Sequence, residues 1–167
     1  MKSDSLTMDL ALETHKLVRI MPEQIPDCWQ FISGPISESL VHSVDGKNMS
    51  LVFTSLVAGY LEAWVLLRRI SEDGWEDSVT AAVATLQIMQ DNNTGIRSVL
   101  IYSLTGAEYL SDELWADMIA GTAEYGRANN CTNITVVSSN PRIIKVFKKA
   151  GASSDTRFMV MEIGVEQ

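Results

Sequence analysis

Three consecutive runs of apolar and β-branched residues lie in the middle of the chain, and they constrain the fold more than any other feature. The runs cover residues 60–70, 75–89 and 97–104. Residues 71–74, which end in an Asp-Gly step typical of tight hairpin turns, separate the first two runs. A polar loop at residues 90–95 leads to the third. Because short connections join antiparallel neighbours, the sequence predicts an antiparallel meander.

The segment before this meander contains one predicted strand and two predicted helices. Residues 15–21 form an apolar run that a proline stops, which indicates a strand. A helix with apolar residues at helical spacing follows from Pro26, and the Gly34-Pro35 step is expected to kink or split it. Asn48 is suited to cap a second, shorter helix.

The segment after the meander alternates between helical and strand-like patterns. A helix begins at Ser111, with two acidic residues in its first turn. Residues 132–138 are predicted to form a strand, residues 141–150 a short helix with proline at its first position, and residues 157–163 a final strand.

This order of elements predicts the α/β (α+β) class, with a mixed, mostly antiparallel central sheet and helices on both of its faces. The chain contains no repeat, low-complexity tract or break in composition, so we expect a single domain over residues 15–167. Residues 1–14 are predicted to form an N-terminal arm or tail. The alternation from Leu6 to Leu12 fits an edge strand or a docking arm, and a flexible tail fits equally well.

The chain is acidic, with 13 Lys and Arg residues against 21 Asp and Glu residues and a formal charge of −8. This charge argues against a general nucleic-acid binder. The basic residues between Arg142 and Lys149 are interpreted as a solvated helix face or as an anion or partner contact. No apolar run reaches the roughly 18 residues of a membrane span, and the acidic start does not resemble a secretory signal. We therefore expect a cytoplasmic protein.

Metal binding and common hydrolytic chemistry find no support in the sequence. Cys28 and Cys131 stand alone, without a further cysteine or a histidine at the spacing of metal ligands. His15 and His42 are isolated as well, and neither a Gly-x-Ser-x-Gly nor a His-Glu-x-x-His motif is present. We expect no metal site.

One segment resembles a motif of the GNAT superfamily of acyl-CoA N-acyltransferases. That motif has Asn, then a small or apolar residue three positions on, Tyr seven on, Gly eleven on and an aromatic residue twelve on. Asn140, Ile143, Phe147, Gly151 and Ala152 occupy these positions. Together with the order of elements over residues 15–163, the motif implies a GNAT-like fold.

The resemblance also implies where a cofactor would bind. Members of the family hold the pantetheine arm of acetyl-CoA along the fourth strand and the pyrophosphate on backbone amides at the start of the next helix. The corresponding turn is residues 103–108. The resemblance therefore makes Leu104, Gly106 and Asn140 the candidate cofactor-binding residues. Asn140 is also suited to cap the helix that begins at Pro141.

Several residues depart from the family's pattern. Glu108 stands where the phosphate-binding turn normally has a small residue, and Asp112 and Glu113 add two more carboxylates nearby. The two first-turn acids can also be explained as favourable partners of the helix dipole. Phe147 replaces the tyrosine that the family uses to protonate the departing thiolate, and it fits the apolar face of a helix. No residue is assigned a catalytic role.

Further details resemble a divergent branch of the superfamily that is found mainly among tailed bacteriophages. They are residues 61–65 followed by 78–80, and residues 104–106 followed by Trp115. The favoured interpretation is a non-catalytic, phage-type assembly or interaction module without a cofactor, located in the host cytoplasm or the virion, which binds a protein partner or forms a homo-oligomer. The alternative is an acetyl-CoA-dependent N-acetyltransferase that acts on a small-molecule or protein amine.

Overall fold

The computed structural model describes residues 15–42, 48–70, 74–76, 78–106 and 110–153. The strands are β1 (His15–Ile20), β2 (Glu62–Arg69), β3 (Ser78–Gln90), β4 (Arg97–Gly106) and β5 (Asn133–Val136). The helices are α1 (Ile25–Ser39), α2 (Met49–Val57), α3 (Asp112–Ala128) and α4 (Pro141–Lys149), with the short 3-10 turns η1 (Pro22–Gln24) and η2 (Leu40–His42). The predicted N-terminal arm at residues 1–14 and the predicted strand at residues 157–163 lie outside the described residues.

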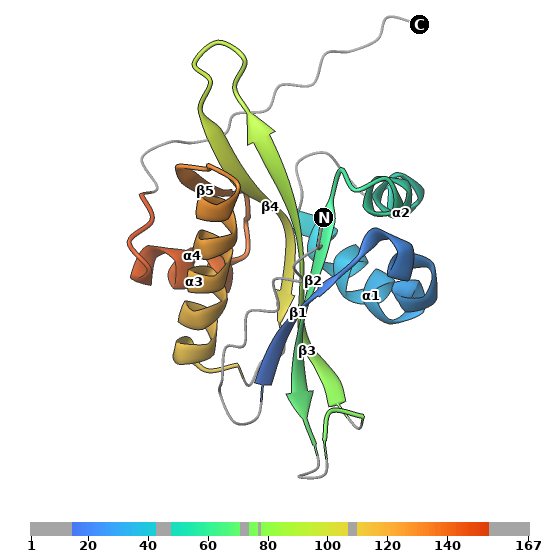
Figure 1. Cartoon of the computed structure of the whole chain (residues 1–167). Coiled ribbons are helices and arrows are strands. Elements are labelled where there is room, and N and C mark those ends of the chain that lie inside the picture. Colours follow the sequence, from blue (N-terminus) through green and yellow to red (C-terminus); the bar gives the residue numbers. More distant parts are fainter. Residues whose placement is uncertain (1–14, 43–47, 71–73, 77, 107–109, 154–167) are drawn as a thin grey trace, which may run out of the picture.

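The described strands form one sheet in the order β1-β2-β3-β4-β5, with helices on both faces (Figure 1). Neighbouring strands from β1 to β4 are antiparallel, which confirms the predicted meander. β5 pairs parallel to β4, and α3 is the helix that connects these two strands across one face. The predicted fold class, a mixed and mostly antiparallel sheet flanked by helices, is therefore confirmed.

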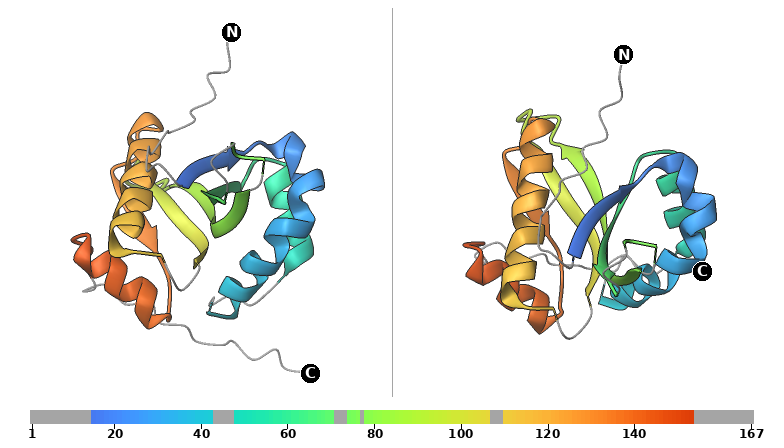
Figure 2. Two further views of the ribbon diagram at one scale, coloured as in Figure 1. Left: turned by 90° about the horizontal axis from the view of Figure 1, so that it is seen from below. Right: turned by 60° about the horizontal axis from the view of Figure 1, so that its bottom comes forward.

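Helices α1 and α2 cover one face of the sheet (Figure 2). Their apolar side chains pack with those of β2 and β3 into one core, which includes Ile32, Leu56 and Val65. The side chain of Asn48 caps α2 by accepting a hydrogen bond from the backbone N–H of Leu51. The ring of Trp29 on α1 meets the ring of Phe53 on α2 edge to face, with 5.0 Å between their centres.

Of the two outcomes expected at the Gly34-Pro35 step, a kink or a split, the split does not occur, because α1 continues through Pro35 as one helix. Proline lacks the N–H that would bond the carbonyl four residues earlier, which belongs to Phe31. The side chain of Phe31 is 64% exposed, so this turn of the helix faces water. Water can satisfy the free carbonyl, and the helix loses a hydrogen bond without ending.

Helices α3 and α4 cover the opposite face. Trp115, Met118 and Tyr125 of α3 and Phe147 of α4 pack with β2, β3 and β4 into the second core. The basic helix α4 thus packs on the sheet with its apolar face, as the helical spacing of its apolar residues predicts. None of the helices in the described residues is long and apolar enough to cross a lipid bilayer.

Two irregularities in β4 position the candidate site. The register of β4 against β3 shifts where Thr85 pairs with Ser103 and Leu86 pairs with Ile101, so Tyr102 is an extra residue in β4. Such a bulge bends a strand and re-aims its side chains. On the other edge of β4, pairing with β5 ends at Ile101 and Val136, although β4 continues to Gly106.

Candidate functional site

A cleft opens where β4 runs on beyond the end of its pairing with β5. Its volume is about 310 Å³. One wall is the second half of β4 and the end of α1, and the other is the segment from β5 to the first turn of α4. The lining residues come from positions far apart in the chain and are Glu38, Ser39, Ile101, Tyr102, Ser103, Leu104, Thr105, Gly106, Trp115, Val136, Val137, Ser138, Asn140, Arg142 and Ile143. The three predicted cofactor-binding residues, Leu104, Gly106 and Asn140, therefore lie in one cleft.

Two hydrogen bonds made by hydroxyl groups tie the β4 wall to its neighbours. The buried hydroxyls of Thr85 and Ser103 hydrogen bond to each other at 2.6 Å across β3 and β4, next to the bulge. The Thr105 hydroxyl donates to the Pro35 carbonyl of α1 at 2.7 Å. These bonds tie β4 to its neighbouring strand and to α1.

Asn140 shapes the opposite wall. Its side-chain oxygen accepts a hydrogen bond from the Arg142 backbone N–H at 3.0 Å and caps α4, as the sequence suggests. Its own backbone N–H donates to the Ser138 hydroxyl at 3.1 Å. Asn140 therefore fixes where α4 begins, at the edge of the cleft.

Gly106 packs against the floor of the cleft. A Cβ atom at this position would lie 2.7 Å from both Leu110 Cδ1 and Trp115 Cζ2, closer than real contacts allow. Trp115 is almost completely buried, with 2% of its surface exposed. The glycine is thus required by the packing of two large side chains, a role that its resemblance to a phosphate-binding glycine does not reveal.

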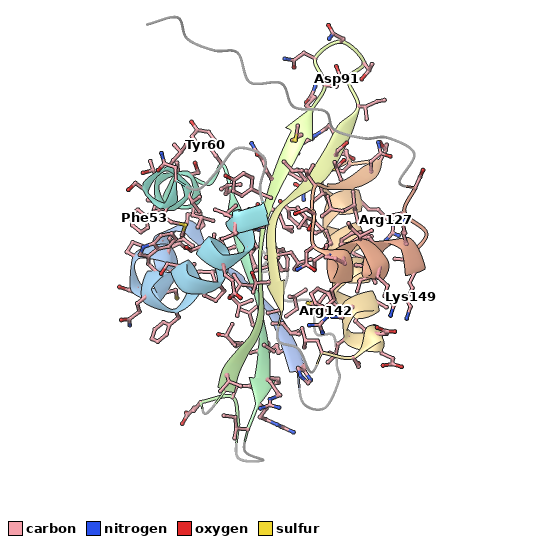
Figure 3. All side chains as sticks on the ribbon, turned by 180° about the vertical axis from the view of Figure 1, so that it is seen from behind. Phe53, Tyr60, Asp91, Arg127, Arg142 and Lys149 are labelled. Atoms are coloured by element: carbon pink, nitrogen blue, oxygen red, sulfur yellow. The ribbon has the colours of Figure 1, made fainter. Side chains whose placement is uncertain are left out.

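Arg142 also lines this cleft, and in the sequence it belongs only to a general basic cluster. Its guanidinium donates a hydrogen bond to the Leu110 carbonyl at 3.3 Å and lies 5.6 Å from the centre of the Trp115 ring. Figure 3 shows Arg142 on the side of the sheet that α3 and α4 cover. Its place two residues after Asn140 is the one signal in the sequence that links it to the candidate site.

The start of α3 lies beside this arginine, because Leu110 directly precedes the residue that caps the helix. Ser111 caps α3 through its hydroxyl, which accepts from the Leu114 N–H at 3.2 Å. Asp112 forms an ion pair with Lys149 of α4. The hydrogen bond from Lys149, followed by its charge, lowers the pKa of the Asp112 carboxyl.

The cluster of carboxylates expected at the phosphate-binding turn is therefore partly neutralised. Lys149 compensates Asp112, while Glu113 is exposed at the surface. Glu108, the strongest departure in the sequence, lies outside the described residues. Among the residues that the structure describes, the carboxylate that lines the cleft is Glu38 at the end of α1, and no pattern in the sequence singles it out.

Phe147 does not line this cleft. It is 6% exposed and packs in the core between α4, α3 and the sheet. The position that carries a proton-donating tyrosine in the family is thus a core position in this chain. Its interpretation as the apolar face of a helix is confirmed.

A second polar group lies on the face of the sheet that α3 covers, around Glu62 at the start of β2. Arg19 donates a hydrogen bond to Glu62 at 2.7 Å, and both side chains are partly buried. Burial raises the pKa of the Tyr125 phenol, and its hydrogen bond with Glu62 raises it further. The Tyr125 ring also meets Trp64 edge to face. This ion pair ties β1 and β2 to α3 and has no residue in common with the cleft lining.

The cleft fits the pantetheine arm that the resemblance implies. Its volume lies at the lower end of the roughly 300–1,000 Å³ typical of ligand pockets, so it has room for a slender chain. Beyond Ile101 the outer edge of β4 has no strand partner in the described residues. A strand edge offers backbone N–H and C=O groups, which suit the two amides of a pantetheine arm. A group of residues able to hold a metal ion is absent from the described part of the chain.

No protein-family model matches this sequence, and the search of curated proteins gives no match. Solved structures, in contrast, resemble it over nearly its whole length. A GNAT family acetyltransferase from Staphylococcus aureus has a TM-score of 0.59 and 12% identity, over 90% of this chain and 99% of that chain.

Two further structures give the same result. A ribosomal-protein-alanine N-acetyltransferase from Brucella melitensis has a TM-score of 0.62 and 11% identity, over 90% of this chain and 99% of that one. A predicted acetyltransferase from Clostridium acetobutylicum, solved with acetyl-CoA, has a TM-score of 0.62 and 13% identity, over 89% and 96%. This chain therefore has the fold of GNAT acetyltransferases, and at these identities the likeness concerns the fold.

Proposed function

We propose that the cleft binds the pantetheine arm of an acyl-CoA and that the protein transfers the acyl group to an amine. The observation that carries this proposal is the open cleft between the diverging ends of β4 and β5. A fold kept only as an interaction module has no need of such a cavity, and large side chains would close it at little cost. Leu104, Gly106 and Asn140 keep their proposed places in the cofactor site.

An acyl-CoA would supply the acyl thioester: the amine nitrogen bonds to the acyl carbon, the carbon–sulfur bond breaks, and the sulfur receives the proton that the amine loses. The residues of the chain bind and orient. The free edge of β4 would form hydrogen bonds with the pantetheine arm. The buried Trp115 side chain would keep water away from the floor of the cleft. Glu38 places a carboxylate on the cleft wall, where it would favour a cationic amine.

The rate of this reaction is expected to be low. Phe147 carries no proton and lies in the core, so the proton would reach the sulfur from water. General acid catalysis contributes about 10²- to 10⁴-fold, and its loss slows transfer without abolishing it. Phe147→Tyr would place the new hydroxyl in the core, and we expect no gain in turnover from it.

Calorimetric titration tests the proposal. Purified protein is titrated with acetyl-CoA, with desulfo-CoA and with ATP, the last as a control for non-specific nucleotide binding. We expect both CoA compounds to bind with micromolar affinity and ATP to bind at least about tenfold more weakly. Absence of heat with acetyl-CoA up to millimolar concentration would contradict the proposal.

The second candidate is the non-catalytic module, which would act in the assembly of bacteriophage particles through a protein partner or as a homo-oligomer. Two observations favour it. Phe147 offers no proton, and large apolar side chains are exposed on the helices and loops of the α1 and α2 side, including Phe31, Leu51 and Tyr60. Figure 3 shows Tyr60 on this side.

Light scattering after size-exclusion chromatography distinguishes the two candidates when it is combined with the titration. A stable oligomer that binds no acetyl-CoA would support the module. A protein that binds acetyl-CoA and acylates any member of an amine panel would exclude it.

A further inference from the structure

We infer that the outer face of α1 docks on the outer face of α4 in a second copy of this chain, so that copies associate head to tail. The two helices cover opposite faces of the sheet (Figures 1 and 2). Each leaves a stripe of side chains open to solvent, and the two stripes match in charge and in spacing. The contact needs no acyl-CoA, so it stands independently of the proposed acyl transfer.

The stripe on α1 has an acidic end and an apolar centre. Asp27, Phe31 and Gly34 follow one another at intervals of four and three residues, so they lie on one side of the helix. All three are exposed, and the Phe31 side chain is 64% exposed. The opposite side of α1 is buried in the core that it forms with α2 and the sheet. The ring of Phe31 is therefore available to a partner.

The stripe on α4 contains a shallow depression with an apolar floor and a basic rim. Its lining residues are Pro141, Ile144, Lys145, Lys148 and Lys149. The Ile144 side chain is 38% exposed, although most apolar residues of α4 face the core. Lysine side chains have long apolar stems and carry their charge at the tip. Such a surface suits an aromatic ring that has a carboxylate beside it.

The spacing of the two stripes matches when the helices run antiparallel. In this register three pairs meet: Phe31 with Ile144, Asp27 with Lys148, and Gly34 with Pro141. Four residues of α-helix span about 6 Å and three span about 4.5 Å, so the intervals on both helices are equal. A Cβ atom at Gly34 would meet nothing within 4 Å, so this part of α1 has room for the proline ring.

The charges select α4 as the occupant. The formal charge of −8 makes two copies repel each other in most orientations. Residues 20–46 contain no Lys or Arg, whereas residues 142–149 contain four of the 13 cations in the chain. Asp112 lies beside α4 and pairs with Lys149. Neither Asp27 nor Lys148 forms an ion pair within the part of the chain that the structure describes. Docking α1 on α4 brings these opposite charges together.

The placement of the two stripes determines the kind of assembly. Because they point away from each other, a pair of copies makes the contact once and leaves one stripe of each kind open. Such a heterologous contact continues into a ring or an open chain of copies. The contact surface of two helix faces is small, so we expect weak association, with a dissociation constant of about 10–1,000 μM.

Sedimentation equilibrium of the full chain tests the inference over protein concentrations from about 10 μM to about 1 mM. We expect the average mass of the wild-type protein to rise with concentration past the mass of a dimer. A mass that stays at one chain over the whole range would overturn the inference. A mass that stops at two chains would overturn it as well, because it would indicate a symmetric contact.

Two variants block one stripe each. Phe31→Gln and Ile144→Gln change exposed side chains, so we expect both proteins to fold, and we expect association of each to weaken at least about tenfold. An equimolar mixture should form pairs and stop there, because the first variant keeps its α4 stripe and the second keeps its α1 stripe. A mixture that associates no better than the separate variants would contradict head-to-tail docking.

Ile96→Gln is the matched control for these variants. Ile96 is 46% exposed and lies in the turn between β3 and β4, outside both stripes. This variant should associate like the wild type. If it weakens association as much as Phe31→Gln does, the effect belongs to surface hydrophobicity in general, and the inference fails.

A charge exchange tests the register of the two helices. Asp27→Lys and Lys148→Asp should each weaken association several-fold, since each places like charges opposite one another. The double variant with both changes should recover most of the loss, because every contact again joins opposite charges. Destabilised folding cannot produce such recovery. If the double variant associates no better than the single variants, the proposed pairing of α1 with α4 is wrong.

Discussion

Gly106 shows how one residue serves packing and a candidate site at once. Gly106→Ala would bring a methyl group within 2.7 Å of the Leu110 and Trp115 side chains. The end of Leu110 can move, but the buried Trp115 ring has little room, so we expect a loss of about 1–3 kcal/mol in the free energy of unfolding. Chemical denaturation followed by fluorescence measures this loss.

Gly34→Ala is the control for that substitution. A Cβ atom at Gly34 meets nothing within 4 Å, and the residue lies inside α1. Alanine favours helix over glycine by up to about 1 kcal/mol, so this variant should be as stable as the wild type or more stable. If Gly106→Ala is as harmless as Gly34→Ala, the claim that the packing of Leu110 and Trp115 requires a glycine at position 106 is contradicted.

Asp112 gives the stability of the protein a dependence on pH. Lys149 lowers its pKa in the folded protein below the unfolded value of about 3.9. The ion pair therefore contributes stability above that value and loses it as the pH falls through the lower, folded pKa. We expect Asp112→Asn to lower the melting temperature slightly at pH 7, because both side chains are exposed, and to match the wild type more closely at about pH 3.

Glu113→Gln is the control for Asp112→Asn, since it removes a carboxylate from the same first turn of α3. Both variants lose a favourable interaction with the helix dipole. The difference between them reports the ion pair. Thermal unfolding at the two pH values measures it, and a difference that is the same at both would contradict the assignment.

The sequence singled out Leu104, Gly106 and Asn140 through a motif, and the fold brings all three to one cleft. It could not single out Arg142. An arginine among lysines on a short helix is typical of a solvated face, and the groups that orient it, Leu110 and Trp115, lie far away in the chain. Contacts of this kind depend on tertiary structure and leave no local pattern.

At the scale of elements, the bond between Thr105 and Pro35 joins β4 to α1 across the cleft wall. Thr105→Val keeps the shape of the side chain and removes the donor. We expect a loss of about 1 kcal/mol in the free energy of unfolding, because the Pro35 carbonyl loses its partner from β4. Thr105→Val should also bind acetyl-CoA more weakly, since α1 no longer holds this part of β4 at the cleft.

Thr132→Val provides the comparison for Thr105→Val. The Thr132 hydroxyl lies 3.4 Å from the Arg97 carbonyl at an exposed position, a long and weak hydrogen bond. This variant should change stability by less than about 0.5 kcal/mol. Equal effects of the two substitutions, measured by chemical denaturation, would show that the Thr105 bond does not hold the wall.

The elements themselves were largely predictable, because each carries its own periodicity. The four helices and the meander appear where the spacing of apolar residues changes, and their boundaries move by only a few residues. The strand predicted for residues 132–138 is shorter, at Asn133–Val136. Its apolar residues continue past Val136, so the pattern could not show that pairing with β4 stops there and that a cleft begins.

At the scale of the whole molecule, a ligand that binds only the folded protein must stabilise it. At a concentration about 100 times its dissociation constant, the gain is about 2.7 kcal/mol. For a domain of this size we expect acetyl-CoA to raise the melting temperature by roughly 5–10 °C, which thermal unfolding with and without ligand measures. ATP serves as the control, and an equal shift with ATP would contradict specific binding in the cleft.

The fold class followed from the order of elements, whereas the cleft is a property of the assembled sheet. Its walls come from β4, α1 and the start of α4, and they meet because α3 carries the chain across one face to a parallel strand. No local pattern in the sequence encodes the divergence of β4 and β5. The proposed function depends on this last feature, whereas the sequence-based preference for a module without a cofactor rested on Glu108, Phe147 and the resemblance to a phage branch.

The pairing of β4 with β5 runs only from Ser98 and Asn133 to Ile101 and Val136, which makes it the narrowest seam in the described sheet. α3 and α4 pack on the sheet through apolar side chains, whereas β5 is joined to β4 by this pairing. Opening this pairing breaks few hydrogen bonds, so we expect amides of β5 to exchange with deuterated solvent before those of β3. A ligand bound in the cleft would contact both β4 and the segment that follows β5, and it would therefore slow the opening of this pairing.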